Sequence, residues 1–180
     1  MNETKFMIVL QPVEERDLEE FKKGVQEAFS EAVVKEFGKV EEPIPSVRDL
    51  EESLRAPGSA AFHIVDRGSR IGGVVLGIHP ETQCNSLDFF FVRPEHQDKG
   101  VGQAAWKAVE EKYPQTRIWE TVTPYFEKRN IHFYVNRCGF KIVKFINKYC
   151  SDTCPEFSEE EVPVGCDEVF FFEKVMERDV

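Results

Sequence analysis

The fold of this chain is decided by the stretch Val92-Arg93-Pro94-Glu95-His96-Gln97-Asp98-Lys99-Gly100-Val101-Gly102. The apolar segment before it, Leu87 to Val92, has the composition of a buried strand. A strand that turns through glycines into a helix gathers unpaired backbone N–H groups, and with the helix dipole these favour a bound anion. A Cβ atom at Gly100 or Gly102 would hold a phosphate away from the backbone, and Lys99 can add a charge-assisted contact. The stretch therefore predicts a phosphate-binding turn, with helix capping or tight packing as the competing explanation of the glycines.

Hydrophobic periodicity predicts the elements on both sides of this turn. Strands are expected at residues 6–10, 61–66, 71–78, 87–92, 117–122, 140–146 and 169–175. Helices are expected from residue 13 onward, at 101–113 and at 127–138. This alternation predicts one α/β domain over residues 1–180, with a mixed sheet and helices on both faces.

Residues 41–59 contain several chain-breaking prolines and a glycine between the first helix and the second strand. Within them, Ser46-Val47-Arg48-Asp49 has the spacing that caps a short helix. The segment either covers a site or is a plain connector. In the strand expected at residues 71–78, Gly72, Gly73 and Gly77 weaken the strand or permit close backbone approach.

The overall charge limits the class of partner. The chain has 180 residues, 41% of them hydrophobic, and a formal net charge of -10. This balance argues against nucleic acid or an anionic membrane as partner, because both reward positive charge. It mildly favours a cationic substrate such as an amine. Residues Lys128 to Lys148 are basic without any acid, and form either a local polyanion site or a solvated face.

Targeting and metal signals are weak. No stretch approaches the roughly 18 apolar residues that would cross a bilayer, and the N-terminus lacks the pattern of a secretory signal. Five cysteines form an odd set, which favours free thiols and a cytoplasmic location. A zinc site from Cys150, Cys154 and Cys166 is a weak alternative, so no metal is expected.

A second motif makes a family resemblance specific. Asn130-Ile131-His132-Phe133-Tyr134 is followed by Cys138-Gly139-Phe140, while Gln97-x-x-Gly100-x-Gly102 follows the strand residue Val92 by five positions. Together these two motifs and the element order resemble the GNAT superfamily of N-acetyltransferases over roughly residues 5 to 176. The resemblance implies a GNAT-like mixed, mostly antiparallel seven-stranded sheet, and acetyl-CoA as co-substrate.

The same resemblance implies positions for the acetyl-CoA molecule. The backbone of Phe90, Phe91 and Val92 would contact the pantetheine arm. The diphosphate would be surrounded by Gln97, Asp98, Lys99, Gly100, Val101, Gly102 and Gln103. The strand at residues 117–122 would diverge from the one ending at Val92 and leave a slot for the thioester. Two positions depart from the family pattern: Glu127 stands where an Asn is usual, with Asn130 as a nearby substitute, and one extra residue separates Tyr134 from Gly139.

Acetyl transfer to an amine requires a neutral amine and a proton donor for the departing sulfur. The resemblance implies Tyr134 as the general acid, whereas its helical stripe with Ile131 and Cys138 suggests a core residue. Asp88 and Glu120 are the candidates for the base, because burial beside the slot would raise the pKa of either carboxyl. Each could instead anchor the substrate ammonium or form an ion pair, and a water chain could act as the base.

The sequence thus predicts an N-acetyltransferase that moves acetyl from acetyl-CoA to a primary amine by direct attack in a ternary complex. The alternatives are a non-catalytic acyl-CoA-binding or sensing module, and an enzyme for a longer acyl-CoA. The expected acceptor is a small-molecule or peptide amine, with acidic segments favouring a cationic one. Either a monomer or a homodimer is compatible with the sequence, since the last two strands could pair across a dimer.

Overall fold

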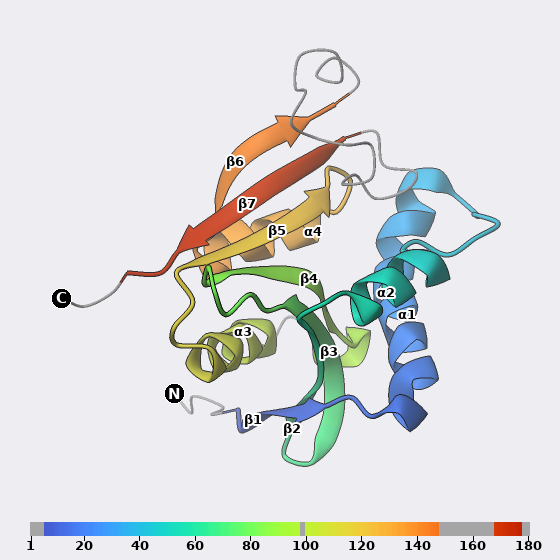
Figure 1. The fold of residues 1–180 in the computed structure, drawn as a ribbon. Coiled ribbons are helices and arrows are strands. Elements are labelled where there is room, and N and C mark those ends of the chain that lie inside the picture. The colour runs from blue at the N-terminus through green and yellow to red at the C-terminus, as the bar shows by residue number, and fades with distance from the viewer. Residues whose placement is uncertain (1–5, 98–99, 148–167, 178–180) are drawn as a thin grey trace, which may run out of the picture.

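The computed structural model describes residues 6–97, 100–147 and 168–177. Seven strands form one sheet in the order β1-β2-β3-β4-β5-β7-β6 (Figure 1). They are β1 (Ile8–Pro12), β2 (Ser59–Asp66), β3 (Ser69–Gly77), β4 (Cys84–Val92), β5 (Ile118–Pro124), β6 (Lys141–Ile146) and β7 (Val169–Val175). Every neighbouring pair is antiparallel except β4 and β5, which are parallel. The predicted mixed, mostly antiparallel seven-stranded sheet is confirmed.

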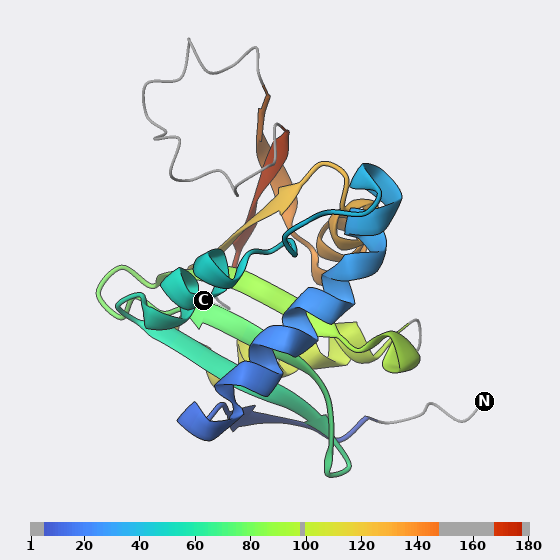
Figure 2. The same cartoon turned by 90° about the vertical axis from the view of Figure 1, so that its right-hand side faces the viewer.

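Helices cover both faces of the sheet, as predicted. On one face lie α1 (Leu18–Phe37) and α2 (Val47–Arg55), and Figure 2 shows α1 crossing the strands on the near side. On the other face lie α3 (Val101–Lys112) and α4 (Lys128–His132), the latter continued by a π-helical turn, η3 (Phe133–Cys138). Short 3-10 turns precede α1 and follow β4, as η1 (Glu15–Asp17) and η2 (Pro94–His96). Each helical layer has its own apolar core against the sheet.

The helix α2 begins with the predicted capping box. Ser46 Oγ accepts a hydrogen bond from the Asp49 backbone N–H at 3.1 Å, and the Ser46 N–H donates to Asp49 Oδ2 at 3.3 Å. These two bonds satisfy amide groups that the first helical turn otherwise leaves without partners. Four predicted residues therefore position a nine-residue helix.

Glycines in β3 allow close packing beneath α1. A Cβ atom on Gly73 would lie 2.3 Å from the Phe21 ring, and one on Gly72 would lie 2.2 Å from the Phe91 carbonyl oxygen. Both distances are too short for a real side chain. The absence of side chains at these positions lets α1 and β4 lie close to β3. Of the two sequence interpretations, a weakened strand or close backbone approach, the structure supports the second.

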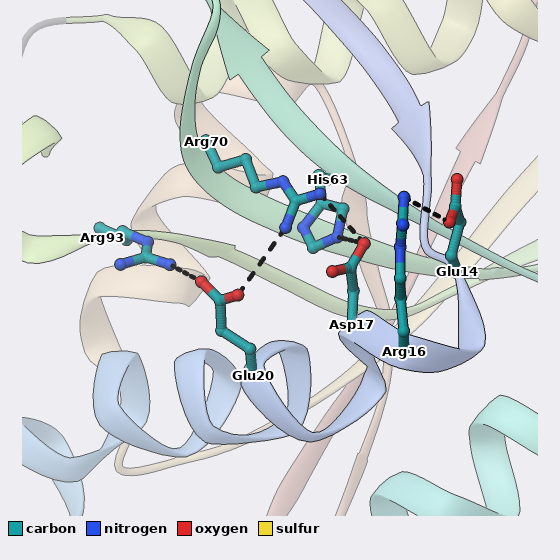
Figure 3. A network of polar contacts seen from close by, with 7 residues as sticks. All are labelled: Glu14, Arg16, Asp17, Glu20, His63, Arg70 and Arg93. Carbon is teal, nitrogen blue, oxygen red and sulfur yellow. Dashed lines mark hydrogen bonds and ion pairs between the residues drawn. The ribbon is translucent and has the colours of Figure 1, made fainter.

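A polar network fixes the start of α1 to β2, β3 and the end of β4 (Figure 3). Asp17 Oδ2 accepts a hydrogen bond from Arg70 Nη2 at 3.0 Å and lies 3.8 Å from His63 Nε2. Glu20 lies 3.4 Å from Arg93 Nη2 and 3.7 Å from Arg70 Nη1. His63 is 4% exposed, and burial, followed by the nearby Arg70 charge, lowers its pKa.

We expect this buried histidine to make the protein less stable as the pH falls below about 6.5. The unfolded chain takes up a proton there, whereas folded His63 resists it, so the stability present above that pH is lost on acidification. Thermal unfolding between about pH 5.5 and about pH 7.5 checks this against His63→Gln, which cannot be charged. The wild type should lose more Tm on acidification than the variant, and parallel curves for the two proteins would contradict the assignment.

Candidate functional site

The strands β4 and β5 separate partway along their length. They pair only from Cys84 with Ile118 to Leu87 with Thr121. Further on, β4 stays paired with β3 as far as Val92, while β5 stays paired with β7 as far as Pro124. The two strands therefore diverge where the sequence resemblance implied a slot for a thioester.

A bulge in β4 lies at the point of divergence. Leu87 pairs with Leu76 and Phe89 pairs with Val75, so Asp88 is the extra residue of β4. A bulge changes the alternation of side chains along a strand. Leu87 and Phe90 consequently face the core on the α3 side, while Phe89 packs beside α1 and α2.

A cleft of about 1480 Å³ opens beside the divergence, between α2, β4, β5, α4 and the β6–β7 pair. Its acidic lining residues are Asp49, Glu52, Asp88, Glu120, Glu127 and Glu173, and its basic ones are Arg48 and Lys144. Arg48 is already paired with Glu52, with 2.7 Å between Nε and Oε1. The six carboxyl groups outnumber the two bases, so the cleft is suited to a cation.

Two of these carboxyl groups are direct neighbours in the sheet. Strand register places Ser86, Glu120, Glu173 and Lys141 in one row across β4, β5, β7 and β6. Like charges directly opposite one another on adjacent strands are destabilising, and Lys141, opposite Glu173, places one positive charge in the same row. Glu120 is exposed to solvent, contrary to the burial expected for it from the sequence.

Asp88 is held by hydroxyl groups from two elements. Its Oδ1 accepts a hydrogen bond from Ser86 Oγ at 2.6 Å, and its Oδ2 accepts one from Ser53 Oγ at 2.8 Å. These bonds supply the partners that a carboxylate in an apolar strand requires. They also attach α2, which carries Ser53, to the bulge of β4.

Tyr134 lines the cleft and is also a core residue. Its side chain is 4% exposed, and its ring lies 5.7 Å from both the Phe140 and the Phe172 ring centroids. Burial raises the pKa of its phenol, while hydrogen bonds with Thr121 and Thr123 act in the opposite direction. The phenol therefore keeps its proton at neutral pH, and the two sequence interpretations of Tyr134 are compatible.

Glu127 is the feature that the sequence interpretation did not place among the functional residues. It is 5% exposed although it lines the cleft, and burial raises its pKa to about 7. Within the part of the chain that the structure describes, its Oε1 has no hydrogen-bond partner. The signal in the sequence was that Glu127 stands where the family usually has an Asn. Asn130, the suggested substitute, is half-buried and lines the same cleft.

The end of β4 is fixed from the side of α4. Phe90, Phe91 and Val92 are buried, with exposed fractions of 6%, 6% and 8%. The Val92 carbonyl accepts a hydrogen bond from Gln97 Nε2 at 2.6 Å, and Gln97 Oε1 accepts one from Arg129. Gln97 thus connects the strand end to α4. Asp98 and Lys99, expected near a diphosphate, lie outside the described residues.

The two glycines of the turn have different structural reasons. Gly100 has a φ of 80°, a left-handed conformation that favours glycine. A Cβ atom on Gly102 would lie 3.0 Å from the Phe133 ring, so tight packing between α3 and η3 accounts for that glycine. Gln103 is also engaged, since its Nε2 donates to the Arg137 carbonyl at 3.0 Å.

The first turn of α3 retains the properties of an anion site. Its N-cap, Gly100, provides no side-chain cap hydrogen bond. The amide groups of Val101 and the following residues therefore point out of the helix end, where the dipole favours negative charge. A diphosphate fits this arrangement.

The extra residue between Tyr134 and Gly139 is taken up by η3. The segment Phe133–Cys138 is π-helical, and Gly139 ends it with a φ of 80°. A π turn contains one residue more than an α turn. Tyr134 and Cys138 are consequently both buried, and Phe140 follows them into the core.

The described ranges contain neither a metal-binding cluster nor a membrane-spanning helix. No group of three His, Cys, Asp or Glu side chains there could hold a metal ion. No helix there is long and apolar enough to span a bilayer. Cys150, Cys154 and Cys166, the weak zinc alternative, lie outside those ranges.

The fold, with strands that diverge beside the start of α3, is that of an acyl-CoA-dependent acetyltransferase. The sequence model described as Acetyltransferase (GNAT) family matches residues 23–140. This chain belongs to the GNAT family of acetyltransferases. The predicted family and enzyme class are confirmed, and acetyl-CoA is the co-substrate of this class.

One curated protein and two solved structures are similar to this chain, and the two structures share its fold. A Bacillus subtilis protein described as "Uncharacterized protein YrkN" is 49% identical over 181 residues, covering 98% of this chain and 97% of its own. The crystal structure of an acetyltransferase from Thermus thermophilus has a TM-score of 0.66 and 18% identity, covering 94% of this chain and 97% of that one. A Bacillus subtilis acetyltransferase in complex with CoA has a TM-score of 0.64 and 18% identity, covering 96% of this chain and 100% of that one.

Proposed function

We propose that this acetyltransferase moves acetyl from acetyl-CoA to a positively charged primary amine by direct attack in a ternary complex. The observation that supports it most is the cleft beside the divergence of β4 and β5, which is lined by six carboxyl groups and by Tyr134. Acetyl-CoA supplies the acetyl group as an activated thioester. We also propose that residues 1–180 act as one acetyltransferase domain, since the described strands form one sheet.

The acetyl-CoA molecule would lie between β4 and the start of α3. The backbone of Phe90 to Val92, which β5 does not cover, would contact the pantetheine arm. The residues Gln97 to Gln103 would surround the diphosphate, with free amide groups at the start of α3 as its main donors. In this arrangement Gln97 positions the strand end, and Asn130 lies at the margin of the cleft.

Tyr134 would act on the departing sulfur. Its phenol stays protonated at neutral pH, so it can donate a hydrogen bond to sulfur as the carbon–sulfur bond breaks. A thiol has an ordinary pKa of about 8.5, lower than that of a phenol, so full proton transfer from Tyr134 would be uphill. Hydrogen bonding is therefore the main contribution that we assign to this residue.

Asp88 and Glu120 would bind the substrate ammonium rather than remove its proton. The two Asp88 oxygens already accept hydroxyl hydrogen bonds, which orient the carboxylate into the cleft. Glu120 is exposed and lies opposite Glu173, so the pair can share one cation. This is the anchoring alternative that the sequence left open for both residues.

A turnover screen tests the proposed function. Purified protein is assayed with acetyl-CoA against neutral amines, monoamines, diamines, polyamines and lysine-containing peptides, and binding of acetyl-CoA is measured by calorimetry. We expect binding, and turnover that favours amines with a second positive charge. Absence of acetyl-CoA binding would overturn the proposal, and binding without turnover of any amine would favour the sensing alternative.

Neutralising the carboxylate row should weaken acceptor binding. The double variant with Glu120→Gln and Glu173→Gln is expected to raise KM for a cationic amine by about 10-fold at low salt, because two charges facing the ammonium are lost. The KM for acetyl-CoA should stay the same. Steady-state kinetics at two ionic strengths measure this, and the effect should shrink at high salt.

A matched control for this double variant is Glu111→Gln. Glu111 is an exposed residue of α3 paired with Lys107, on a helix that does not line the cleft. Its replacement lowers the negative charge of the whole protein without touching the cleft. An equal change in KM for the control and the double variant would mean that net charge, rather than the carboxylate row, attracts the amine.

A further inference from the structure

We propose that the Glu127 carboxylate accepts the proton that the acceptor amine must lose, an inference that rests on the proposed transfer to an amine. Family resemblance did not assign this residue a role, because an Asn is usual at its position. Its side chain is buried in the cleft wall, and one of its carboxyl oxygens has no hydrogen-bond partner among the described residues.

The backbone of Glu127 is fixed where β5 ends and α4 begins. Its N–H donates to the Pro124 carbonyl at 3.0 Å, and its own carbonyl accepts from the Ile131 N–H at 3.0 Å. The side chain is 5% exposed, yet it forms part of the cleft wall together with Tyr134 and Asn130. The carboxyl therefore belongs to the same cleft wall as Tyr134, the residue proposed to act on the departing sulfur.

A buried carboxyl oxygen without a partner is costly, and native structures contain few of them. Glu127 Oε1 is such an atom within the described part of the chain. A protein that folds with this cost leaves a hydrogen-bonding site for a molecule that binds in the cleft. The N–H group of an amine fits that site.

The titratable groups around Glu127 come from four elements, η3, α4, β5 and β4. From η3 the Tyr134 phenol interacts with it electrostatically, and from α4 Lys128 and Arg129 are exposed, with Arg129 directed to Gln97. From β5 and β4, Glu120 and Asp88 face the same cleft. Burial alone raises the pKa of Glu127 to about 7, so the carboxyl can gain and lose a proton near neutral pH.

The other carboxyl groups of the cleft have different engagements. Asp49 caps α2, Glu52 pairs with Arg48, and Asp88 accepts two hydroxyl hydrogen bonds. Glu120 and Glu173 lie side by side in the strand row. Among the cleft carboxyl groups of the described residues, Glu127 combines burial with an oxygen that has no hydrogen-bond partner. A base that accepts a proton from a bound amine needs such an oxygen.

The amine nitrogen loses two protons between the ammonium ion and the amide. The amine enters as an ammonium ion and gives one proton to the Glu127 carboxylate. Its nitrogen lone pair then forms the bond to the acetyl carbonyl carbon, and the carbon–sulfur bond breaks with its electron pair going to sulfur, to which Tyr134 donates a hydrogen bond. The nitrogen loses a second proton on forming the amide. This second proton ends on sulfur, and the first proton leaves Glu127 for solvent.

The test is the pH profile of kcat/KM for Glu127→Gln against the wild type, with a turnover-positive amine. In the wild type we expect kcat/KM to rise through a limb near pH 7, separate from the limb near pH 10 that belongs to the amine itself. The Gln variant should lose about 10²-fold at the plateau and should lack the limb near pH 7. Its affinity for acetyl-CoA should match that of the wild type.

Further variants separate a catalytic role from a structural one. Glu127→Asp keeps a carboxyl and is expected to retain the limb and part of the rate, and Asp88→Asn and Glu120→Gln should retain the limb near pH 7. Glu111→Gln should match the wild type throughout. If the wild type turns over and Glu127→Gln keeps the limb or loses less than about 5-fold, the Glu127 proposal is overturned while the proposed function stands. If the wild type itself acetylates no amine, the proposed function fails.

Discussion

Replacing Tyr134 with phenylalanine is expected to lower kcat by about 10²-fold while acetyl-CoA affinity stays within about 2-fold of the wild type. The substitution removes only the phenol oxygen, and the ring keeps its contacts with Phe140 and Phe172. The phenol's hydrogen bonds with Thr121 and Thr123 are also lost, but the loss expected to lower kcat is that of the hydrogen bond to sulfur, which strengthens as the carbon–sulfur bond breaks. Single-turnover kinetics and calorimetry measure the two quantities.

The control for this prediction is Tyr113→Phe. Tyr113 follows α3, its ring lies 6.2 Å from the Trp119 ring centroid, and burial raises its pKa as well. It does not line the cleft. We expect this variant to keep the wild-type kcat. Equal rates for the wild type and Tyr134→Phe would show that Tyr134 serves the core alone.

The second large effect concerns stability. Glu127→Gln is expected to raise the free energy of unfolding by about 3 kcal/mol above about pH 8, and by only about 1 kcal/mol near pH 5. Folded Glu127 has a pKa raised to about 7 from an ordinary value of 4.5, so between these values the folded state binds the extra proton. Wild-type stability therefore falls as the pH rises through that window, whereas the uncharged Gln does not titrate.

Urea unfolding of the two proteins at about pH 5 and about pH 8.5, under reducing conditions, measures the difference. His63 gives a slope of the opposite sign, but it is common to both proteins and cancels in the comparison. A constant difference between the proteins across this range would contradict burial of a titrating carboxyl. If the prediction holds, the residue that we propose as the base also destabilises the resting enzyme, as is common for active sites.

Local patterns of the sequence predicted the elements well. The capping box at Ser46 and the α3 stripe both depend on residues within one or two helical turns of each other, so spacing alone shows them. The ends of elements were less accurate: β4 starts at Cys84 rather than Leu87, and β1 includes Pro12, which an edge strand tolerates.

Local motifs in the sequence identify candidate site residues, but they do not reveal contacts between segments far apart in the chain. The isolated carboxylate of Asp88 indicated that a partner was needed, but Ser53 is 35 residues away and spacing cannot identify it. The row of Glu120 and Glu173 results from strand register between segments far apart in sequence. Burial of Glu127 likewise results from packing around the end of β5, so its chemistry became visible only in three dimensions.

The π-helical turn η3 accommodates one inserted residue without changing the direction in which the Tyr134 side chain points. A regular helix advances about 100° per residue, so one inserted residue would rotate everything before it by that angle relative to β6. The wide turn removes that rotation, and Tyr134 still points into the core. Counting back from Gly139 with the usual family spacing would select Val135, which is less buried. In this chain the tyrosine is therefore identified by the orientation of its side chain rather than by residue count.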